Sequence, residues 1–261
     1  MIPDDYQRGF RRLTTIVLGT IVFLIFDVNR NLILRFCPDN PDLWDTKTFP
    51  WIADLEAAYP AIRLEIEQYL RARDGVDAAM ADVATMNGYE VDGDGAESSV
   101  PGVRGHWRAV PLYLFGRWKP QSVDFPETKL ATRNIPWMNN YGFSGLDPGS
   151  HILKHVGPNK GALRFQLPII VPGDFGDCRI WVNGETVNWE EGKAVVFDLA
   201  VPHEVWNDTD STRILLMMEL RTPLPFALSL VNRFAQWTFR FFPSFRGLQS
   251  RVDQMQIQPT T

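Results

Sequence analysis

Histidine and cysteine are both scarce in this chain of 261 residues, which holds four histidines and two cysteines. The cysteines, Cys37 and Cys178, lie far apart in unrelated contexts. A disulfide framework is therefore not expected, and two reduced thiols fit a reducing compartment. Any histidine-based metal site must draw on a small set: His106, His151, His155 and His203.

The chain also lacks an excess of positive charge. It has 26 Lys and Arg against 31 Asp and Glu, for a net charge of −5. A general nucleic-acid-binding domain is usually basic, so no nucleic-acid partner is expected. Hydrophobic residues make up 45%, as in a globular protein with a true core, and the length allows one large domain or two small ones.

A long uninterrupted apolar run is missing as well. Residues 13–26, LTTIVLGTIVFLIF, are apolar, but they fall short of the ~20 residues of a membrane-spanning helix, and Asp27 is expected to end the run. Basic residues precede it, although no signal-peptide cleavage site follows. Two interpretations stay open: a buried N-terminal helix, or a short membrane anchor or interfacial helix, which the apolar residues at 32–36 favour. We treat residues 1–45 as an apolar segment and linker.

Helical periodicity begins at Trp51, with apolar residues at three- and four-residue steps. Pro60 interrupts the pattern, so two helices are expected, at 51–58 and 61–73, supporting a sheet. Residues 74–105 are rich in Gly, Asp, Ala and Ser and predict a loop near the functional site.

The centre of the chain carries a β pattern. Strands are predicted at residues 106–115, 137–144, 150–156, 162–171, 178–182, 185–189, 194–198, 203–207 and 212–220. Asn183-Gly184 between two apolar runs is typical of a two-residue hairpin. Short strands at this spacing predict a mainly β fold, a sandwich or barrel, over residues 46–225.

The C-terminal part, residues 226–261, is expected to hold an amphipathic helix within 225–245. As a helix it places Leu230, Phe234, Trp237 and Phe241 on one side. This helix could pack on the barrel or lie on a membrane surface, and the sequence leaves both open.

Two histidines stand at strand edges. Strict alternation puts His151, Leu153 and His155 on one strand face, with His155 before a Gly-Pro turn, while His203 begins a later strand. Imidazole suits Fe(II), and the usual non-haem oxygenase site adds one carboxylate. The position two residues after His155, where that carboxylate could stand, is Gly157.

Two arginines lie in strands that should be buried. Alternation places Arg164 and Gln166 on one face of their strand, and Arg213 lies on a later one. A buried guanidinium needs an anionic partner, because its desolvation is costly. That partner could be a bound dianion, or a side chain such as Asp198 or Glu219.

Several spaced segments, taken together, resemble a known family. They are PGSHILKHVGP, LRFQLPIIVP, CRIWVNGETVNWEEGKAVVFD, HEVWND and RILLMMELRTPLP. In this order they are similar to the aspartyl/asparaginyl β-hydroxylase family, from about Thr48 to Pro225. The resemblance implies a double-stranded β-helix core, of the jelly-roll or cupin type, with N-terminal supporting helices and a C-terminal helix.

The resemblance also implies a cofactor set and its residues. Fe(II) would be bound by His155 and His203, with water in place of the missing carboxylate. The co-substrate 2-oxoglutarate would be contacted by Ser144, Arg164, Gln166 and Arg213, with Arg213 pairing with its distal carboxylate. Many members carry a histidine where this chain has Gln166, and glutamine cannot become cationic.

The resemblance implies a hydroxylase that uses O2 on an unactivated C–H bond. The first expectation is the β-carbon of an Asp- or Asn-type residue or amino acid, and the alternative is a lipid acyl chain at a membrane. A non-catalytic, cupin-like binding protein is the alternative from another class. We expect a cytoplasmic location, with membrane association through residues 13–26 and 226–245 left open.

Overall fold

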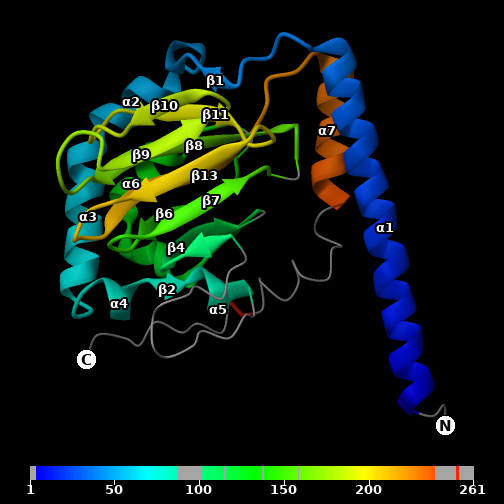
Figure 1. Ribbon diagram of the computed structural model, residues 1–261, viewed down its shortest axis with the longest axis horizontal. Helices are drawn as coiled ribbons and strands as arrows, with labels where there is room; N and C mark the ends of the chain where they lie inside the picture. The colour runs from blue at the N-terminus through cyan, green and yellow to red at the C-terminus, as the bar shows by residue number, and fades with distance from the viewer. Residues whose placement is uncertain are drawn as a thin grey trace.

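The computed structural model describes residues 4–87, 102–114, 116–136, 138–157, 159–238 and 251–252. Two antiparallel sheets form its centre (Figure 1). The larger, eight-stranded sheet has the order β1 (Leu43–Trp44), β11 (Val195–Asp198), β8 (Ala162–Ile170), β13 (Arg213–Arg221), β6 (Met138–Leu146), β4 (Trp107–Leu114) and β2 (Ala81–Asp82), with β5 (Arg117–Trp118) beside β4. The five-stranded sheet has the order β10 (Glu185–Asn188), β9 (Cys178–Val182), β12 (His203–Asn207), β7 (His151–His155) and β3 (Val103–Arg104).

One core lies between the two sheets. Its buried residues include Ile152 and Val205 from the smaller sheet and Phe197 and Leu215 from the larger one. Two antiparallel sheets whose side chains interdigitate in this way form a β-sandwich, which is the architecture of a jelly roll. The predicted fold class, a mainly β jelly-roll core with helices at both ends, is confirmed.

A second core lies between the larger sheet and a helical layer, made mainly by α2 (Trp51–Ala57), α3 (Tyr59–Arg71) and α6 (Pro126–Thr132) (Figure 1). The prediction of two helices around Pro60 is confirmed, because Pro60 stands in the first turn of α3, where its missing N–H is not needed. Single turns complete the layer: η1 (Thr46–Thr48), η2 (Pro120–Asp124), α4 (Val76–Ala79) and α5 (Val83–Asn87).

Two segments predicted as linker or loop carry more structure than expected. Leu43 and Trp44, assigned to the N-terminal linker, form β1 and pair with β11 of the barrel. Residues 76–87 form α4, β2 and α5 rather than a loop. Residues 88–101 of the predicted loop lie outside the described residues, and Val103–Arg104 near its end form β3.

The N-terminal helix α1 runs from Asp4 to Phe36, 33 residues, and so continues past Asp27, where the apolar run of the sequence ends. The Asp27 side chain is held within the helix, because its Oδ2 accepts a hydrogen bond from Asn31 Nδ2 one turn later (3.2 Å). By length and composition, Val17–Phe36, 20 residues, is able to cross a membrane.

The C-terminal helix α7 (Phe226–Thr238) lies beside α1 at one side of the barrel (Figure 1). Its contact with the barrel is polar: Gln236 Nε2 donates to the carbonyl oxygen of Gly161 (2.8 Å). The predicted apolar side, with Leu230, Phe234 and Trp237, is exposed. Residues 239–245 of the predicted helix, including Phe241, lie outside the described part of the chain.

Candidate metal and anion site

A β-bulge in β7 decides which histidines face the barrel interior. His203 pairs with His155, whereas Val205 pairs with Ile152 and Trp206 with His151, and the register shifts between His203 and Val205. Cross-strand partners share a face, so His155 and Ile152 face inward and His151 faces outward. The prediction that His151 and His155 share a face was wrong, because strict alternation has no place for the extra residue.

The two inward histidines lie together with their ring centroids 4.1 Å apart. His155 Nδ1 lies 2.8 Å from the carbonyl oxygen of Leu153, and His203 Nδ1 lies 2.8 Å from that of Val201. A carbonyl only accepts, so each Nδ1 carries a proton, and in the neutral ring Nε2 then presents a lone pair. This is the arrangement in which a second hydrogen bond orients a metal-binding imidazole.

Burial keeps His203 neutral. Desolvation lowers its pKa to about 4, and the neighbouring His155 and Arg164 act in the same direction. His155, by contrast, is exposed, so the pair is open to solvent on that side. A metal bound here would retain free coordination positions facing the opening.

The missing carboxylate is a steric feature of the fold as well as a feature of the sequence. Gly157 N–H donates to the carbonyl oxygen of Leu199 (2.9 Å), which joins the segment after His155 to the one before His203. A Cβ at Gly157 would lie 2.5 Å from Leu199 Cγ and 2.6 Å from its carbonyl oxygen. Among the described residues, no group of three or more His, Cys, Asp or Glu could hold a metal ion.

Arg213 supplies a buried positive charge between the sheets. It is 2% exposed, and its Nε and Nη1 make no hydrogen bond within the described residues. Its guanidinium lies over the ring of Trp189, 4.5 Å from the ring centroid. Burial lowers the pKa of Arg213 to about 9. An unpaired guanidinium in such a place is poised for an anion.

Arg164 and Gln166 face the same interior. Burial lowers the pKa of Arg164, and the nearby Glu219 opposes that shift, so one of the predicted internal acidic neighbours is present. Gln166 Oε1 accepts a hydrogen bond from Trp189 Nε1 (3.2 Å), which leaves its amide group as a donor. The other predicted acidic neighbour, Asp198, pairs with Lys160 instead (2.5 Å).

Ser144 lies opposite Leu215 across the β6–β13 pair, so it also faces the space between the sheets. Its Oγ accepts from Trp107 Nε1 (2.9 Å). The sequence prediction missed the part played by Trp189, which contacts both Gln166 and Arg213. Nothing in the local pattern around Trp189 distinguishes it from an ordinary core tryptophan.

The two remaining histidines have ordinary structural partners. His151 Nε2 lies 2.7 Å from Glu204 Oε1, and its ring stacks on Trp206. His106 Nδ1 lies 2.9 Å from Asp82 Oδ2.

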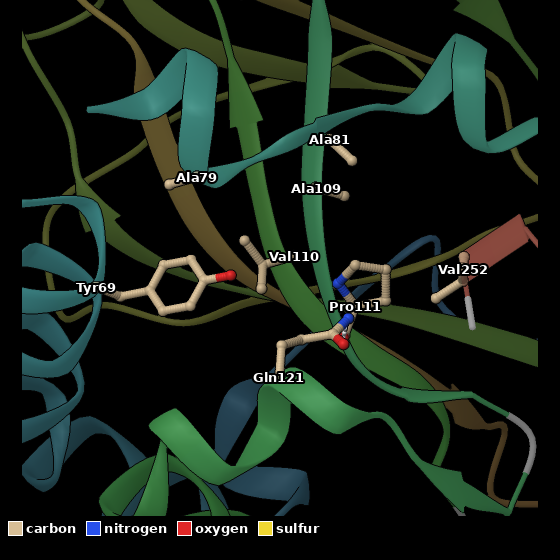
Figure 2. Close-up of a pocket in the computed structure, with 8 residues that line it drawn as sticks. All are labelled: Tyr69, Ala79, Ala81, Ala109, Val110, Pro111, Gln121 and Val252. Carbon is tan, nitrogen blue, oxygen red and sulfur yellow. Dashed lines mark hydrogen bonds between the residues drawn. The ribbon is translucent and has the colours of Figure 1, made fainter. Parts of the chain in front are cut away.

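A small cavity of about 40 Å³ lies away from the histidines, between α3, β4 and η2 (Figure 2). The hydroxyl of Tyr69 points into it and has no hydrogen-bond partner among the described residues, while Gln121 bonds the carbonyl oxygen of Pro111. A buried water needs roughly 10–15 Å³ and polar partners, so this cavity suits water better than a substrate.

Comparison with known proteins places the chain in a family. Residues 56–223 match the family model described as aspartyl/asparaginyl β-hydroxylase, so the chain belongs to this family. The match covers the barrel strands β2 to β13 and thus both histidines and all four predicted co-substrate residues.

Two relatives show the range of the family. An ornithine lipid ester-linked acyl 2-hydroxylase from Rhizobium tropici is 35% identical over 194 residues, which is 74% of this chain and 65% of that protein. The human aspartyl/asparaginyl β-hydroxylase is 30% identical over 131 residues, 46% of this chain and 16% of that protein. The chain thus spans less than two thirds of either relative.

Among solved structures, a cupin domain of a transcriptional regulator from Enterobacter cloacae aligns with 45% of this chain and 98% of that chain. The TM-score is 0.31 and the sequence identity is 12%.

Proposed function

We propose that this protein is an Fe(II)- and 2-oxoglutarate-dependent oxygenase that hydroxylates an unactivated C–H bond. The observation that carries the proposal is that a candidate metal site and a candidate anion site lie in the same barrel. Two histidines whose Nδ1 atoms each lie 2.8 Å from a carbonyl oxygen stand side by side with Nε2 available to a metal, and a buried, unpaired guanidinium is available for an anion.

Each residue has a role that its surroundings support. Nε2 of His155 and of His203 would hold the iron, and Arg213 would bind the distal carboxylate of 2-oxoglutarate in a bidentate pair. Gln166 would donate a hydrogen bond and Arg164 would add positive charge, while Ser144 lines the same space. Burying the Arg213 guanidinium without a partner costs free energy. A bound dianion would offset that cost by pairing with the guanidinium, so the empty site favours dianion binding.

When bound, iron and 2-oxoglutarate would supply O2 activation and the oxidising power for hydroxylation. The chain contributes orientation and a dry environment. The buried side chains of Phe197, Leu215 and Trp189 exclude water from the space between the sheets. The exposed side of His155 leaves the opening through which a substrate chain can approach.

For the substrate, we propose a lipid acyl chain. The support is the Rhizobium tropici relative, whose name gives an ornithine lipid ester-linked acyl chain and which matches 74% of this chain. The apolar helix α1 suits a protein that works at a membrane. The side chain of an Asp or Asn residue, as in the name of the human relative, is the second candidate and is supported by a shorter match.

Metal binding by the four histidine-to-alanine variants tests the site directly. We expect His155→Ala and His203→Ala to lower the affinity for Fe(II), measured anaerobically, by at least about 100-fold. His151→Ala and His106→Ala are matched controls, because those rings face Glu204 and Asp82, and they should bind as the wild type does. Equal loss in all four variants, or no Fe(II) binding by the wild type, would contradict the proposed metal site and favour a non-catalytic barrel.

A further inference from the structure

The helix α7 has the reverse of the polarity expected for a helix on a water-soluble barrel. Asn232 and Gln236 are buried against the rest of the protein. Four large apolar side chains of the same helix are exposed: Phe226, Leu230, Phe234 and Trp237. A surface helix in water normally turns its apolar side inward.

The helix α1 is apolar on its buried side and also exposes many apolar side chains along its described part. Val22, Asn29 and Ile33 are buried and fall on one stripe at helical spacing. Large apolar side chains occupy positions on both sides of this stripe and opposite to it, and they are exposed: Val17, Ile21, Phe23, Leu24, Val28, Leu34 and Phe36. A helix that is apolar around most of its circumference belongs inside a protein or inside a membrane.

Amide side chains join the two helices to the barrel. Asn29 Nδ2 donates to Asn232 Oδ1 (3.1 Å), and Asn232 Nδ2 donates to the carbonyl oxygen of Gly161 (2.8 Å). That same oxygen accepts from Gln236 Nε2 (2.8 Å). Gly161 permits this approach because it has no side chain, since a Cβ there would lie 1.9 Å from Asn232 Oδ1.

We propose that α1 and α7 form a membrane-docking unit, whose outward apolar surface is covered by a lipid bilayer. Polar groups inside and apolar groups outside are the pattern of helices packed in lipid, where interhelical hydrogen bonds hold helices together. Large exposed apolar surfaces mark sites of membrane or protein contact.

Three observations favour a bilayer over a second protein copy. A protein partner would cover one further stripe of α1, whereas the exposed apolar residues surround most of it. The 20 residues of Val17–Phe36 span roughly 30 Å as a helix, which is the thickness of the hydrocarbon core. In the sequence, Arg8, Arg11 and Arg12 precede this segment and suit anionic lipid headgroups.

The docking unit also fixes where the metal site stands relative to the bilayer. Its amides hold Gly161, which lies in the short connection between His155 at the end of β7 and the start of β8. The open side of the histidine pair is therefore tied through a few residues to the membrane-bound helices. This arrangement suits a substrate chain that stays anchored in lipid while its C–H bond reaches the barrel.

Flotation of the full chain with phosphatidylcholine vesicles, with and without phosphatidylglycerol, tests the docking unit. We expect the wild type to float and to stay bound after a high-salt wash. Two outward pairs of substitutions, Leu24→Asp with Val28→Asp and Phe234→Asp with Trp237→Asp, should each lower the bound fraction at least about tenfold.

The matched controls are Val123→Asp in η2 and Phe175→Asp in the β8–β9 connection, each at a side chain that is 74% exposed and outside α1 and α7. They should float as the wild type does. Equal flotation of outward variants and controls would overturn the proposal, as would release by salt alone or a wild type that forms a discrete dimer and does not float.

Folding and chemistry are followed separately from docking. Circular dichroism and Fe(II) binding in detergent should be unchanged in the outward variants, because these side chains touch neither histidine. Docking that persists while 2-oxoglutarate turnover is absent counts against the proposed chemistry alone. Turnover that persists in a wild type that never binds vesicles counts against the docking unit alone.

Discussion

The surroundings of Arg213 distinguish a ligand-binding arginine from one with a purely structural role. A partly buried arginine with a structural role is paired, as Arg108 is with Asp147 (Nε to Oδ2, 2.7 Å) and with the exposed Asp77. Arg213 has no acidic partner in the described structure, and Trp189 covers one face of its guanidinium. The fold therefore carries a desolvation cost that a bound anion would relieve.

This difference predicts that the same substitution, arginine to methionine, changes the free energy of unfolding in opposite directions at the two positions. Arg213→Met should raise the free energy of unfolding of the cofactor-free protein by roughly 1–4 kcal/mol, because it removes an unpaired buried charge. It should also abolish measurable 2-oxoglutarate binding. Arg108→Met should lower the free energy of unfolding by about 1–2 kcal/mol, because it leaves Asp147 unpaired. Urea unfolding and calorimetric titration measure both, and a destabilised Arg213→Met protein would count against a ligand site.

Gly157 gives a second prediction for a single residue. Gly157→Ala should lower the free energy of unfolding by about 1–3 kcal/mol and weaken Fe(II) binding, because the new Cβ meets the backbone of Leu199 between the two histidines. The neighbouring Val156 is exposed, so Val156→Ala should change stability by less than about 0.5 kcal/mol. If Gly157→Asp were tolerated and tightened Fe(II) binding, the site would have room for a third protein ligand and our account of it would be wrong.

Among the elements, the contact between the β7–β8 connection and α7 is testable by a double-mutant cycle. Gly161→Ala should push Asn232 away and expose the backbone amides of residues 226–238 to faster hydrogen exchange. Asn232→Ala removes the side chain that the new methyl group meets. The double variant should therefore be more stable than the sum of the single effects predicts, by about 0.5–3 kcal/mol. Strict additivity would mean that Gly161 and Asn232 do not touch.

The order of strands could be predicted from the sequence, because turn residues such as Asn183-Gly184 separate apolar runs, and β9 and β10 pair across that turn as expected. The inward faces of β8 and β13 also follow from alternation. The face of His151 could not be predicted, since the bulge in β7 leaves no mark in the pattern of apolar residues. The same holds for the polarity of α7, because periodicity shows that a helix is amphipathic without showing which side meets the protein.

For the whole molecule, the family resemblance predicted more than the residue patterns alone did, because it covered the fold, the cofactors and the site residues together. Two histidines and two arginines at strand edges left a metal site and internal ion pairs as open alternatives. The structure brings His155 and His203 together with 4.1 Å between ring centroids and leaves Arg213 without an ion pair in its described surroundings. The extent of α1 beyond Asp27 could not be predicted from the apolar run alone, because helix continuation depends on the backbone rather than on hydropathy.

The most direct test of the central claim is release of succinate from 2-oxoglutarate by the vesicle-bound wild type with Fe(II) and O2. We predict turnover that is lost in His203→Ala, retained in His151→Ala, and raised by vesicles that contain an acylated lipid substrate, which gains one oxygen atom by mass. Succinate release that is absent in the wild type, or equal in the wild type and His203→Ala, would contradict the account.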